Sequence, residues 1–323
     1  MTSRFDEGDE APPRVAGQRG SSMMPNIVVV GSTMIDVLMY AERTPERGQT
    51  VVGQRMVLGH GGKGANQAAM AARLGARVTF VNRVGNDVFG EMTRANLADQ
   101  GLDLSRVRAV ANEATGVATI WVEPDGNNRI LIVPGANGTL TAADVVDDLA
   151  DVPSADCVIC QLEISPEAVK AALEWGRACG ATTILNPAPA APLSDDLLGL
   201  VDWLIPNESE FEDLFGAAPD DDNLLRASSE VPGGLVVTLG ADGAVAVVKG
   251  GVARFAPPVV QAIDTTGAGD AFLGGLAYSL ARGEPLPAAI AFANRCGALS
   301  TTKFGTRLSF PNLNEVLQER AQS

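Results

Sequence analysis

Short, continuous apolar runs recur along the chain and alternate with segments in which apolar residues have a helical spacing. The runs lie at residues 26–31, 78–85, 157–163, 182–187, 203–207, 235–240 and 244–250. A run of this length without polar alternation is typical of a strand buried on both faces. Helix-like segments include 65–75, which ends at Gly75, and 165–180, which begins with Ser165 and Pro166. The alternation predicts βαβ units around a mainly parallel central sheet, an α/β/α sandwich.

Two segments interrupt this alternation. Residues 36–60 have turn residues in the middle and no helical period, and residues 115–134 alternate apolar and polar positions. The second segment turns at Asp125-Gly126, which is a hairpin signal. We predict that both segments form one small β-sheet, a lid over an active site.

The length and composition favour one large domain. The chain has 323 residues, of which 46% are hydrophobic and 20% charged, so a sizeable core is expected. The predicted domain covers residues 26–314, between a disordered extension at 1–25 and a C-terminal tail at 315–323. Residues 1–25 lack the apolar segment of a secretory signal, and the chain has no apolar run of the roughly 20 residues that cross a bilayer. We therefore expect a cytoplasmic protein with no membrane partner.

The charge of the chain argues against a nucleic-acid partner. The formal net charge is −15, whereas proteins that bind a phosphate backbone present a basic face. A small anionic substrate remains compatible with this charge, because a few backbone N–H groups can hold one locally.

The four cysteines predict no metal site or disulfide. Cys157 and Cys160 form a CxxC pattern inside an apolar run, and positions three apart on a strand point to opposite faces. We expect buried, inert thiols. His60 is the single histidine, which leaves few ligands for zinc.

The first candidate site is the glycine-rich stretch "GHGGKGANQ" at 59–67. It is not a P-loop, because Gly64 follows Lys63 where Ser or Thr is required. It is either a structural turn before a helix or a site in which Lys63, Asn66 and Asp36 converge on hydroxyl groups. Ligands of open α/β sheets bind at the carboxyl ends of the strands, where such loops lie.

The second candidate is "AIDTTGAGDAF" at 262–272, just before a helix-like segment. Gly267, Ala268 and Gly269 leave the backbone accessible, so unpaired N–H groups of a helix N-terminus can approach a phosphoryl anion. Asp270 either caps the helix or accepts a proton from an attacking hydroxyl. The stretch contains no lysine or arginine, and a neighbouring cation would lower the pKa of Asp270. The absence of one favours Asp270 as a base.

The third candidate is "IPNESE" at 205–210, after a predicted strand. Asn207, Glu208 and Glu210 either form the acid-rich start of the following helix or organise Mg²⁺ and its waters around phosphates.

These motifs together resemble the ribokinase-like (PfkB) carbohydrate kinases over residues 26–311. The matching stretches are GSTMID, GGKGANQAA, TGVATI, GAN, QLEI, NPAPA, PNESE, VTLGADG and DTTGAGDAF. The last is the most specific signature of the family, and the matches occur in the family's order.

The resemblance implies a Rossmann-like fold and transfer of the γ-phosphoryl group of ATP, with Mg²⁺, to the 5-hydroxyl of ribose. The implied base is Asp270, and the implied anion hole is Gly267, Ala268 and Gly269. The implied sugar-binding residues are Asp36, Gly62, Lys63, Asn66, Glu163 and Asp270. The implied ATP-binding residues are Asn207, Thr238, Gly240, Gly243, Gly269 and Asn294, and Glu210 would hold Mg²⁺ through water.

The resemblance also implies an activating monovalent cation, K⁺, and a homodimer formed through the lid. The implied K⁺ ligands, mostly backbone carbonyls, are Asp264, Thr266, Ser300, Lys303, Gly305 and Ser309. Two positions depart from the family pattern. Met34 replaces an asparagine that binds sugar in some members, and His60 stands at a usually apolar or aromatic position, as a packing variant rather than a sugar contact. Alternatives are a family kinase for deoxyribose, another sugar or a nucleoside, and a non-catalytic sensor.

Overall fold

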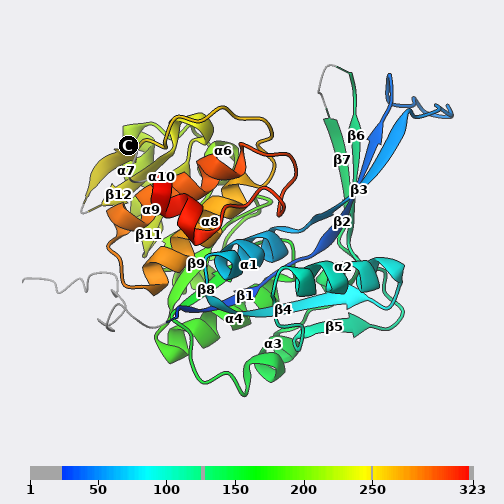
Figure 1. Cartoon of the computed structure of the whole chain (residues 1–323). Helices are drawn as coiled ribbons and strands as arrows, with labels where there is room; N and C mark the ends of the chain where they lie inside the picture. The colour runs from blue at the N-terminus through cyan, green and yellow to red at the C-terminus, as the bar shows by residue number, and fades with distance from the viewer. Residues whose placement is uncertain (1–23, 125–127, 249, 320–323) are drawn as a thin grey trace, which may run out of the picture.

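The computed structural model describes residues 24–124, 128–248 and 250–319 (Figure 1). A nine-stranded sheet forms the centre of the molecule. Its strands, in spatial order, are β13 (Gly251–Phe255), β12 (Ala244–Val248), β11 (Gly234–Thr238), β10 (Trp203–Leu204), β9 (Thr182–Leu185), β8 (Cys157–Cys160), β1 (Asn26–Val30), β4 (Arg77–Gly85) and β5 (Val107–Val110). All pairs from β11 to β5 are parallel, whereas β12 pairs antiparallel with both of its neighbours. The predicted mainly parallel sheet is confirmed.

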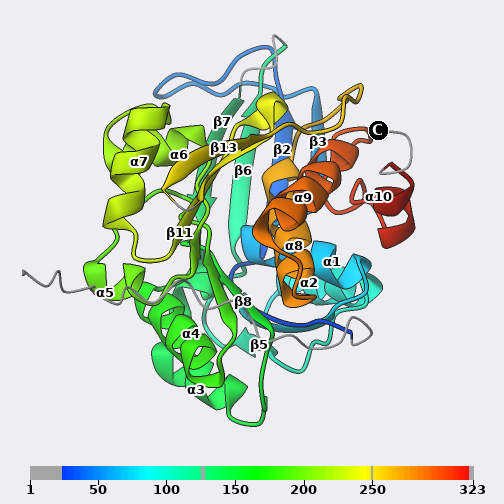
Figure 2. The ribbon, with the colours of Figure 1, turned by 90° about the vertical axis from the view of Figure 1, so that its left-hand side faces the viewer.

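Two layers of helices bury the faces of this sheet. One face packs against α1 (Lys63–Arg73), α2 (Val88–Asp99), α8 (Ala268–Ala281), α9 (Leu286–Ser300) and α10 (Leu313–Glu319). The other packs against α3 (Ala142–Leu149), α4 (Pro166–Cys179), α5 (Asp195–Leu198), α6 (Glu208–Phe215) and α7 (Asp221–Glu230). In Figure 2, β8 lies between α4 on one side and α8 on the other. The predicted α/β/α sandwich is confirmed.

The two cysteines of the CxxC pattern belong to different halves of the core. Cys157 packs in the layer with α8, and Cys160 packs in the layer with α4. Both are free and buried, and burial raises the pKa of each thiol. The alternation of strand side chains therefore separates them, as predicted.

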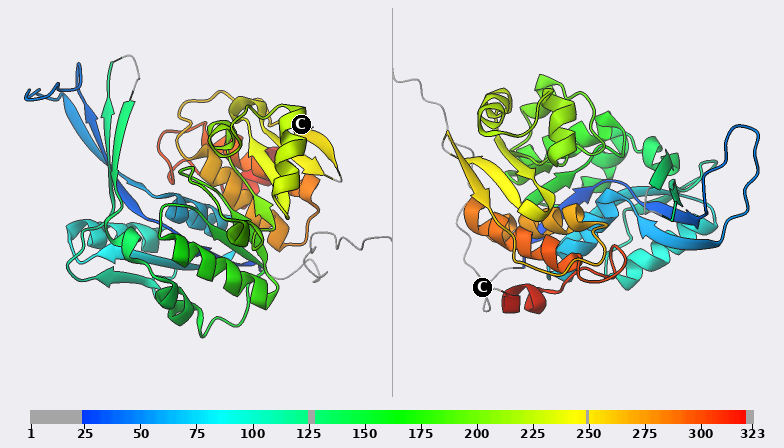
Figure 3. Two further views of the ribbon diagram at one scale, coloured as in Figure 1. Left: turned by 180° about the vertical axis from the view of Figure 1, so that it is seen from behind. Right: turned by 90° about the horizontal axis from the view of Figure 1, so that it is seen from above.

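The two interrupting segments form one four-stranded lid sheet. Its strands are β3 (Arg55–Gly61), β2 (Met34–Tyr40), β6 (Val117–Val122) and β7 (Asn128–Val133), in this spatial order. β2 pairs in parallel with β6, and the outer pairs are antiparallel. Both views of Figure 3 show this sheet extending to one side of the helical layers. The predicted hairpin is confirmed by its pairing, and its turn at Asp125-Gly126 lies outside the described residues.

The predicted domain boundaries need one correction. α10 continues to Glu319, and Val316 within it is fully buried against the core. Residues 315–319 therefore pack as part of the domain, and the predicted tail is wrong for them. The apolar face of this helix was too short to stand out in the sequence. The predicted extension lies largely outside the described residues, while the Pro25 carbonyl accepts the Arg77 N–H. Among the described helices, none is both long and apolar enough to span a membrane.

Candidate active site

The N-terminus of α8 presents free backbone donors. Gly267 is the N-cap residue with φ 79°, and apart from the adjoining residues and backbone of its own helix no heavy atom lies within 4 Å of the position that a Cβ on Gly269 would take. The Ala268 N–H donates to the Thr265 carbonyl at 3.2 Å. The N–H groups of Gly269 and Asp270 have no acceptor in the part of the chain that the structure describes. Free donors at the positive end of a helix dipole can bind an anion.

The Asp270 carboxylate is held by the start of α1. Its Oδ2 accepts from Asn66 Nδ2 at 2.8 Å, and its Oδ1 accepts from Gln67 Nε2 at 2.9 Å. The carboxylate therefore faces another helix, which argues against a simple capping role. Gln67 was not predicted as a site residue, although it adjoins Asn66 in the glycine-rich motif.

Two cations act on Asp270, which the sequence argument did not foresee. Burial raises its pKa, while Lys63, the amide groups of Asn66 and Gln67, and Arg307 oppose the rise. The stretch 262–272 itself holds no cation, but Lys63 and Arg307 approach Asp270 from distant parts of the chain. The net pKa still lies above the ordinary value, which suits a general base.

Lys63 lies where four elements meet. Burial alone would lower the pKa of its ammonium, but Asp270, Glu163 and Glu210 outweigh this effect and raise it, so Lys63 stays charged. Lys63 lines a cleft at the carboxyl edge of the sheet. The other residues of this cleft are Asn186, Ile205, Asn207, Glu210, Thr238, Thr265, Gly267, Ala268, Gly269, Asp270 and Leu273. The helix starts of α1, α6 and α8 thus converge with the end of β11.

Asn207 and Glu210 serve the start of α6 and also line this cleft. Asn207 Oδ1 accepts from the Glu210 N–H at 2.8 Å, and Glu210 Oε2 accepts from the Asn207 N–H at 2.9 Å, a reciprocal capping box. The helix-start interpretation therefore holds alongside the location in the cleft. Burial raises the pKa of Glu210, against the Asn207 N–H and Lys63. Glu208 is exposed and does not line the cleft.

Asp36 projects from β2 beside two glycines of β3. A Cβ on Gly61 would overlap the Asp36 carboxylate, so glycine is required for this close approach. Burial raises the pKa of Asp36 to about 6, with Arg307 opposing the rise and Glu163 and Asp270 adding to it. The strand register pairs Ile35 with His60. His60 therefore lies on the face opposite Asp36, which favours a packing role.

Glu163 is tied to the start of α1. It accepts from the Lys63 N–H at 3.0 Å and from the Ser32 hydroxyl. Burial raises its pKa, and these hydrogen bonds oppose the rise. Gly62 precedes α1 with φ 89°, and a Cβ there would lie 2.5 Å from Thr33 Cα. The predicted sugar residues thus gather around one junction of the lid, α1 and the loop after β8.

The predicted nucleotide residues fall into two groups. Asn207 and Thr238 pair through an isolated bridge and line the cleft. Gly243 lies farther along, in the turn after β11, beside Asn294 of α9. Asn294 Nδ2 donates to the Phe255 carbonyl at 2.6 Å. Gly240 begins the same turn with φ 55°.

Three of the predicted K⁺ ligands are held together by hydrogen bonds. Asp264 Oδ1 and Oδ2 accept from the N–H groups of Thr266 and Gly305, each at 3.0 Å. Burial would raise the pKa of Asp264, but these backbone donors lower it. The other three side chains are engaged elsewhere. Ser300 Oγ donates to the Gly297 carbonyl, Ser309 Oγ donates to the Thr306 carbonyl, and Lys303 Nζ pairs with Glu315 at 3.1 Å.

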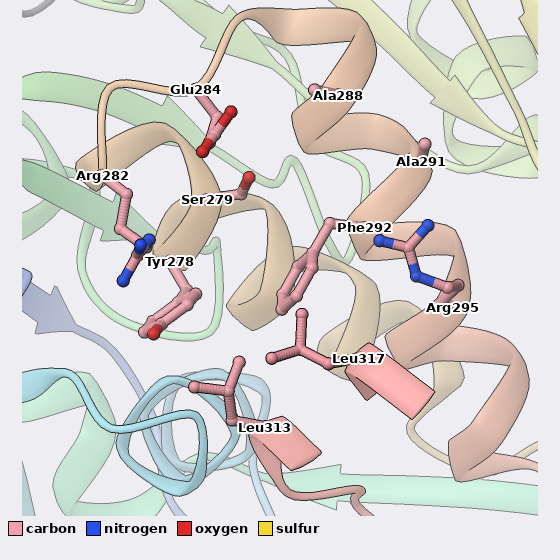
Figure 4. Close-up of a pocket in the computed structure, with 10 residues that line it drawn as sticks. All are labelled: Tyr278, Ser279, Arg282, Glu284, Ala288, Ala291, Phe292, Arg295, Leu313 and Leu317. Atoms are coloured by element: carbon pink, nitrogen blue, oxygen red, sulfur yellow. The ribbon is translucent and has the colours of Figure 1, made fainter. Parts of the chain in front are cut away.

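A second cavity of about 350 Å³ lies at the other end of α8, between α8, α9 and α10 (Figure 4). Its lining includes the stacked rings of Tyr278 and Phe292, with the guanidinium of Arg282 5.8 Å from the Tyr278 ring. None of the predicted site residues lines it.

Comparison with known proteins agrees with this architecture. Residues 24–313 match the model of the pfkB family of carbohydrate kinases. The chain is similar to a ribokinase of Haemophilus influenzae, with 36% identity over 92% of this chain and 98% of the relative. It is also similar to a deoxyribokinase of Salmonella typhi, with 36% identity over 90% of this chain and 97% of the relative. The structure of Arabidopsis thaliana ribokinase complexed with ribose and ATP superposes with a TM-score of 0.84, at 31% identity, over 92% of this chain and 99% of that one. The chain belongs to the pfkB family of carbohydrate kinases.

Proposed function

We propose that this chain transfers the γ-phosphoryl group of ATP to the 5-hydroxyl of D-ribose. The observation that carries the proposal is the Asp270 carboxylate, half-buried beside free amides at the start of α8 and beside the junction that holds Asp36 and Glu163. The similarity to ribokinases over nearly the whole chain supports ribose as the acceptor.

In the proposed reaction, Asp270 accepts the proton of the 5-hydroxyl while the alcohol oxygen forms a bond to the γ-phosphorus. The bond from this phosphorus to the oxygen of ADP breaks, so ribose 5-phosphate and ADP leave. The N–H groups of Gly269 and Asp270, together with Lys63, face the charge that develops on the phosphoryl group. Asp36 accepts hydrogen bonds from two adjacent sugar hydroxyls.

The residues present fit a divalent ion held mainly by phosphates and water. Within the described ranges, no three acidic, cysteine or histidine side chains converge into an all-protein metal cage. Mg²⁺ does not require one, because it usually binds one or two carboxylates together with waters and substrate phosphates. Glu210 would order its waters, and the ion would neutralise charge on the phosphates.

Three further properties belong to the proposal. K⁺ would bind between the loops that Asp264 ties together, through carbonyls near Thr266, Ser300, Lys303, Gly305 and Ser309. The lid would pair with the lid of a second copy, because several of its apolar side chains are exposed, such as Leu131 (67%) and Val133 (55%). The predicted location remains the cytoplasm.

A second acceptor, 2-deoxyribose, is favoured by one observation. Met34 lies on the same face of β2 as Asp36 and is 3% exposed. A side chain there that binds the 2-hydroxyl would favour ribose over 2-deoxyribose, and the apolar side chain of methionine cannot do so. The similarity to a deoxyribokinase, at 36% identity over 90% of this chain, gives this alternative weak further support.

The test is a coupled assay of ADP release with a panel of acceptors. Ribose and 2-deoxyribose are compared with hexoses and nucleosides by kcat/KM. We expect ribose to give the highest value. If another acceptor gives a higher kcat/KM, that acceptor replaces ribose as the proposed substrate. The absence of ADP release with every acceptor would contradict a catalytic function.

A further inference from the structure

Arg307 is a buried arginine behind the candidate active site that none of the predicted roles includes. Its side chain is 3% exposed, on the segment that follows α9. The guanidinium donates through Nε to Asn66 Oδ1 at 2.9 Å, through Nη1 to Asn96 Oδ1 at 2.6 Å, and through Nη2 to the Gly61 carbonyl. Three elements, α1, α2 and the end of β3, are therefore joined by one cation.

These contacts fix the orientation of the Asn66 amide. An arginine can only donate hydrogen bonds, so Asn66 must turn its oxygen toward Arg307. The Asn66 NH₂ group then faces Asp270 Oδ2, at 2.8 Å, and must donate to it. Asp270 accepts this bond best when it is ionised, which is the state that a general base requires.

The same guanidinium anchors the floor of the predicted sugar site. The Gly61 carbonyl that it holds belongs to the residue that packs against the Asp36 carboxylate. A displacement of this strand end would move Asp36 relative to Asp270. Arg307 therefore connects the lid strand to the base through a single rigid fork.

We propose that Arg307 is a positioning residue for phosphoryl transfer, which orients Asn66 toward Asp270 and holds the Gly61 end of the lid in register with it. This inference rests on the proposed function of the site, but it does not depend on which alcohol is phosphorylated.

Several charged groups share the surroundings of Asp270, so the effect of Arg307 on pH dependence must be separated from theirs. The groups that act on Asp270 or respond to it are Lys63, Arg307, Asp36, Glu163 and Glu210. Arg307 lowers the pKa values of Asp270 and Asp36. Its loss should raise both values, and the acid limb of activity should move to higher pH.

The experiment compares Arg307→Gln, Arg307→Lys and Asn96→Ala with the unchanged protein. Each is assayed for kcat, KM and the pH dependence of kcat/KM with the best acceptor of the panel. We expect kcat of Arg307→Gln to fall about 10- to 100-fold, since small misplacements at a reacting centre have effects of this size. Glutamine can both donate and accept, so it no longer fixes the Asn66 amide. Lysine keeps the charge without the fork and should recover the pH profile more than it recovers kcat. Asn96→Ala, which loosens Arg307 alone, should show a smaller loss.

Arg83 provides the matched control, because it is 4% exposed and paired with Asp148 at 2.8 Å in another part of the fold. Arg83→Gln should lower the melting temperature and leave kcat and the pH profile unchanged. The inference is overturned if Arg307→Gln behaves like Arg83→Gln, or if saturating K⁺ restores its kcat. Should Arg307→Gln not fold, an unchanged kcat and pH profile in both Asn96→Ala and Arg307→Lys would overturn it equally. Inactivity of the unchanged protein would instead contradict the proposed function.

Discussion

The two glycine-rich helix starts of this molecule share a positive φ at the preceding glycine but differ in its ψ, 120° at Gly62 and 6° at Gly267, and in their surroundings. Both α1 and α8 follow a glycine with positive φ, Gly62 at 89° and Gly267 at 79°, and neither N-cap has a side chain that could cap the helix. At α1 the protein supplies the acceptors, because the Lys63 N–H donates to Glu163 and the Ala65 N–H donates to the Ser32 carbonyl.

At α8 the corresponding donors stay free. The second and third N–H groups of that helix, those of Gly269 and Asp270, have no acceptor among the residues described. At α1 two of the first three donors are paired and the Gly64 N–H has no acceptor among the described residues, so this helix start chiefly positions side chains, here Lys63 and Asn66. A helix start with unpaired donors can bind an anion. A glycine-led helix start can thus position side chains in one place and offer free donors to an anion in the other.

The largest expected effect concerns the side chain that distinguishes α8. Asp270→Asn should lower kcat by about 100- to 10,000-fold, because the amide cannot accept the hydroxyl proton. The fold and ATP binding should persist, since asparagine keeps the volume of the side chain. Turnover is measured by ADP release, and nucleotide binding by calorimetry. Near-normal turnover with intact binding would remove the base from the mechanism.

A pair of glycine substitutions tests the difference between the two helix starts directly. Gly62→Ala should lower the melting temperature by about 5 °C, because its φ is positive and its Cβ would meet the Thr33 backbone. Gly269→Ala should leave the melting temperature unchanged or slightly higher, since its Cβ enters open space.

The activity of Gly269→Ala should fall although its melting temperature does not. The added methyl group occupies the approach to the free donors, so kcat should fall about tenfold or more. Both proteins are followed by thermal unfolding and by ADP release. A stable, fully active Gly269→Ala protein would show that the free donors of α8 do not carry the anion.

Asp36 lies on the α1 side of this comparison, and its contribution to stability should depend on pH. Its pKa rises from 3.8 to about 6 in the folded protein, mainly through burial. Between these values the folded state holds the extra proton, so the contribution of Asp36 to stability is present below pH 3.8 and is lost as pH rises through about 6. Asp36→Asn should therefore be more stable than the unchanged protein above about pH 6.

Sugar binding should show the reverse dependence. In the proposed reaction the ionised carboxylate accepts hydrogen bonds from the sugar hydroxyls, so KM for the sugar should rise below pH 6 in the unchanged protein. In Asp36→Asn it should be about 10- to 100-fold higher and independent of this titration. Parallel pH series of thermal unfolding and of KM measure the two effects. Equal stability of both proteins at pH 8 would contradict the origin given for the shift.

The elements of this fold were predictable because their signals are local. Uninterrupted apolar runs mark strands buried on both faces, and β1, β4 and β9 follow such runs closely. The alternation around residues 115–134 predicted a hairpin, and β6 and β7 do pair there, although all six residues of β7 are exposed. The helix α10 was not predicted, because a single buried residue, Val316, is a weak periodic signal.

The site was predictable at its motifs and not between them. Asp270 and Lys63 lie in glycine-rich stretches whose backbone requirements are written in the sequence. Their mutual distance, and the cations around Asp270, depend on how α1 and the segment after α9 meet in space. Arg307 is 37 positions from Asp270, and no local pattern connects the two. The sequence could indicate candidate residues, and the packing determines which other residues lie around them.

The smallest expected effect lies behind the α8 helix start, at Asp264. Its carboxylate joins the N–H groups of Thr266 and Gly305, so it brings together the two loops whose carbonyls would surround K⁺. Replacing Na⁺ by K⁺ should raise kcat about two- to tenfold, since a cation there strengthens the positive field at the anion seat. Asp264→Asn, which keeps one acceptor oxygen, should lose most of this response while binding ATP normally. ADP release in matched chloride salts measures the response. The two salts have the same ionic strength, so they screen charges equally. If kcat of the unchanged protein does not change on this exchange, the two loops do not contribute to catalysis through K⁺. The free amides of α8 would then be the whole of the proposed anion seat.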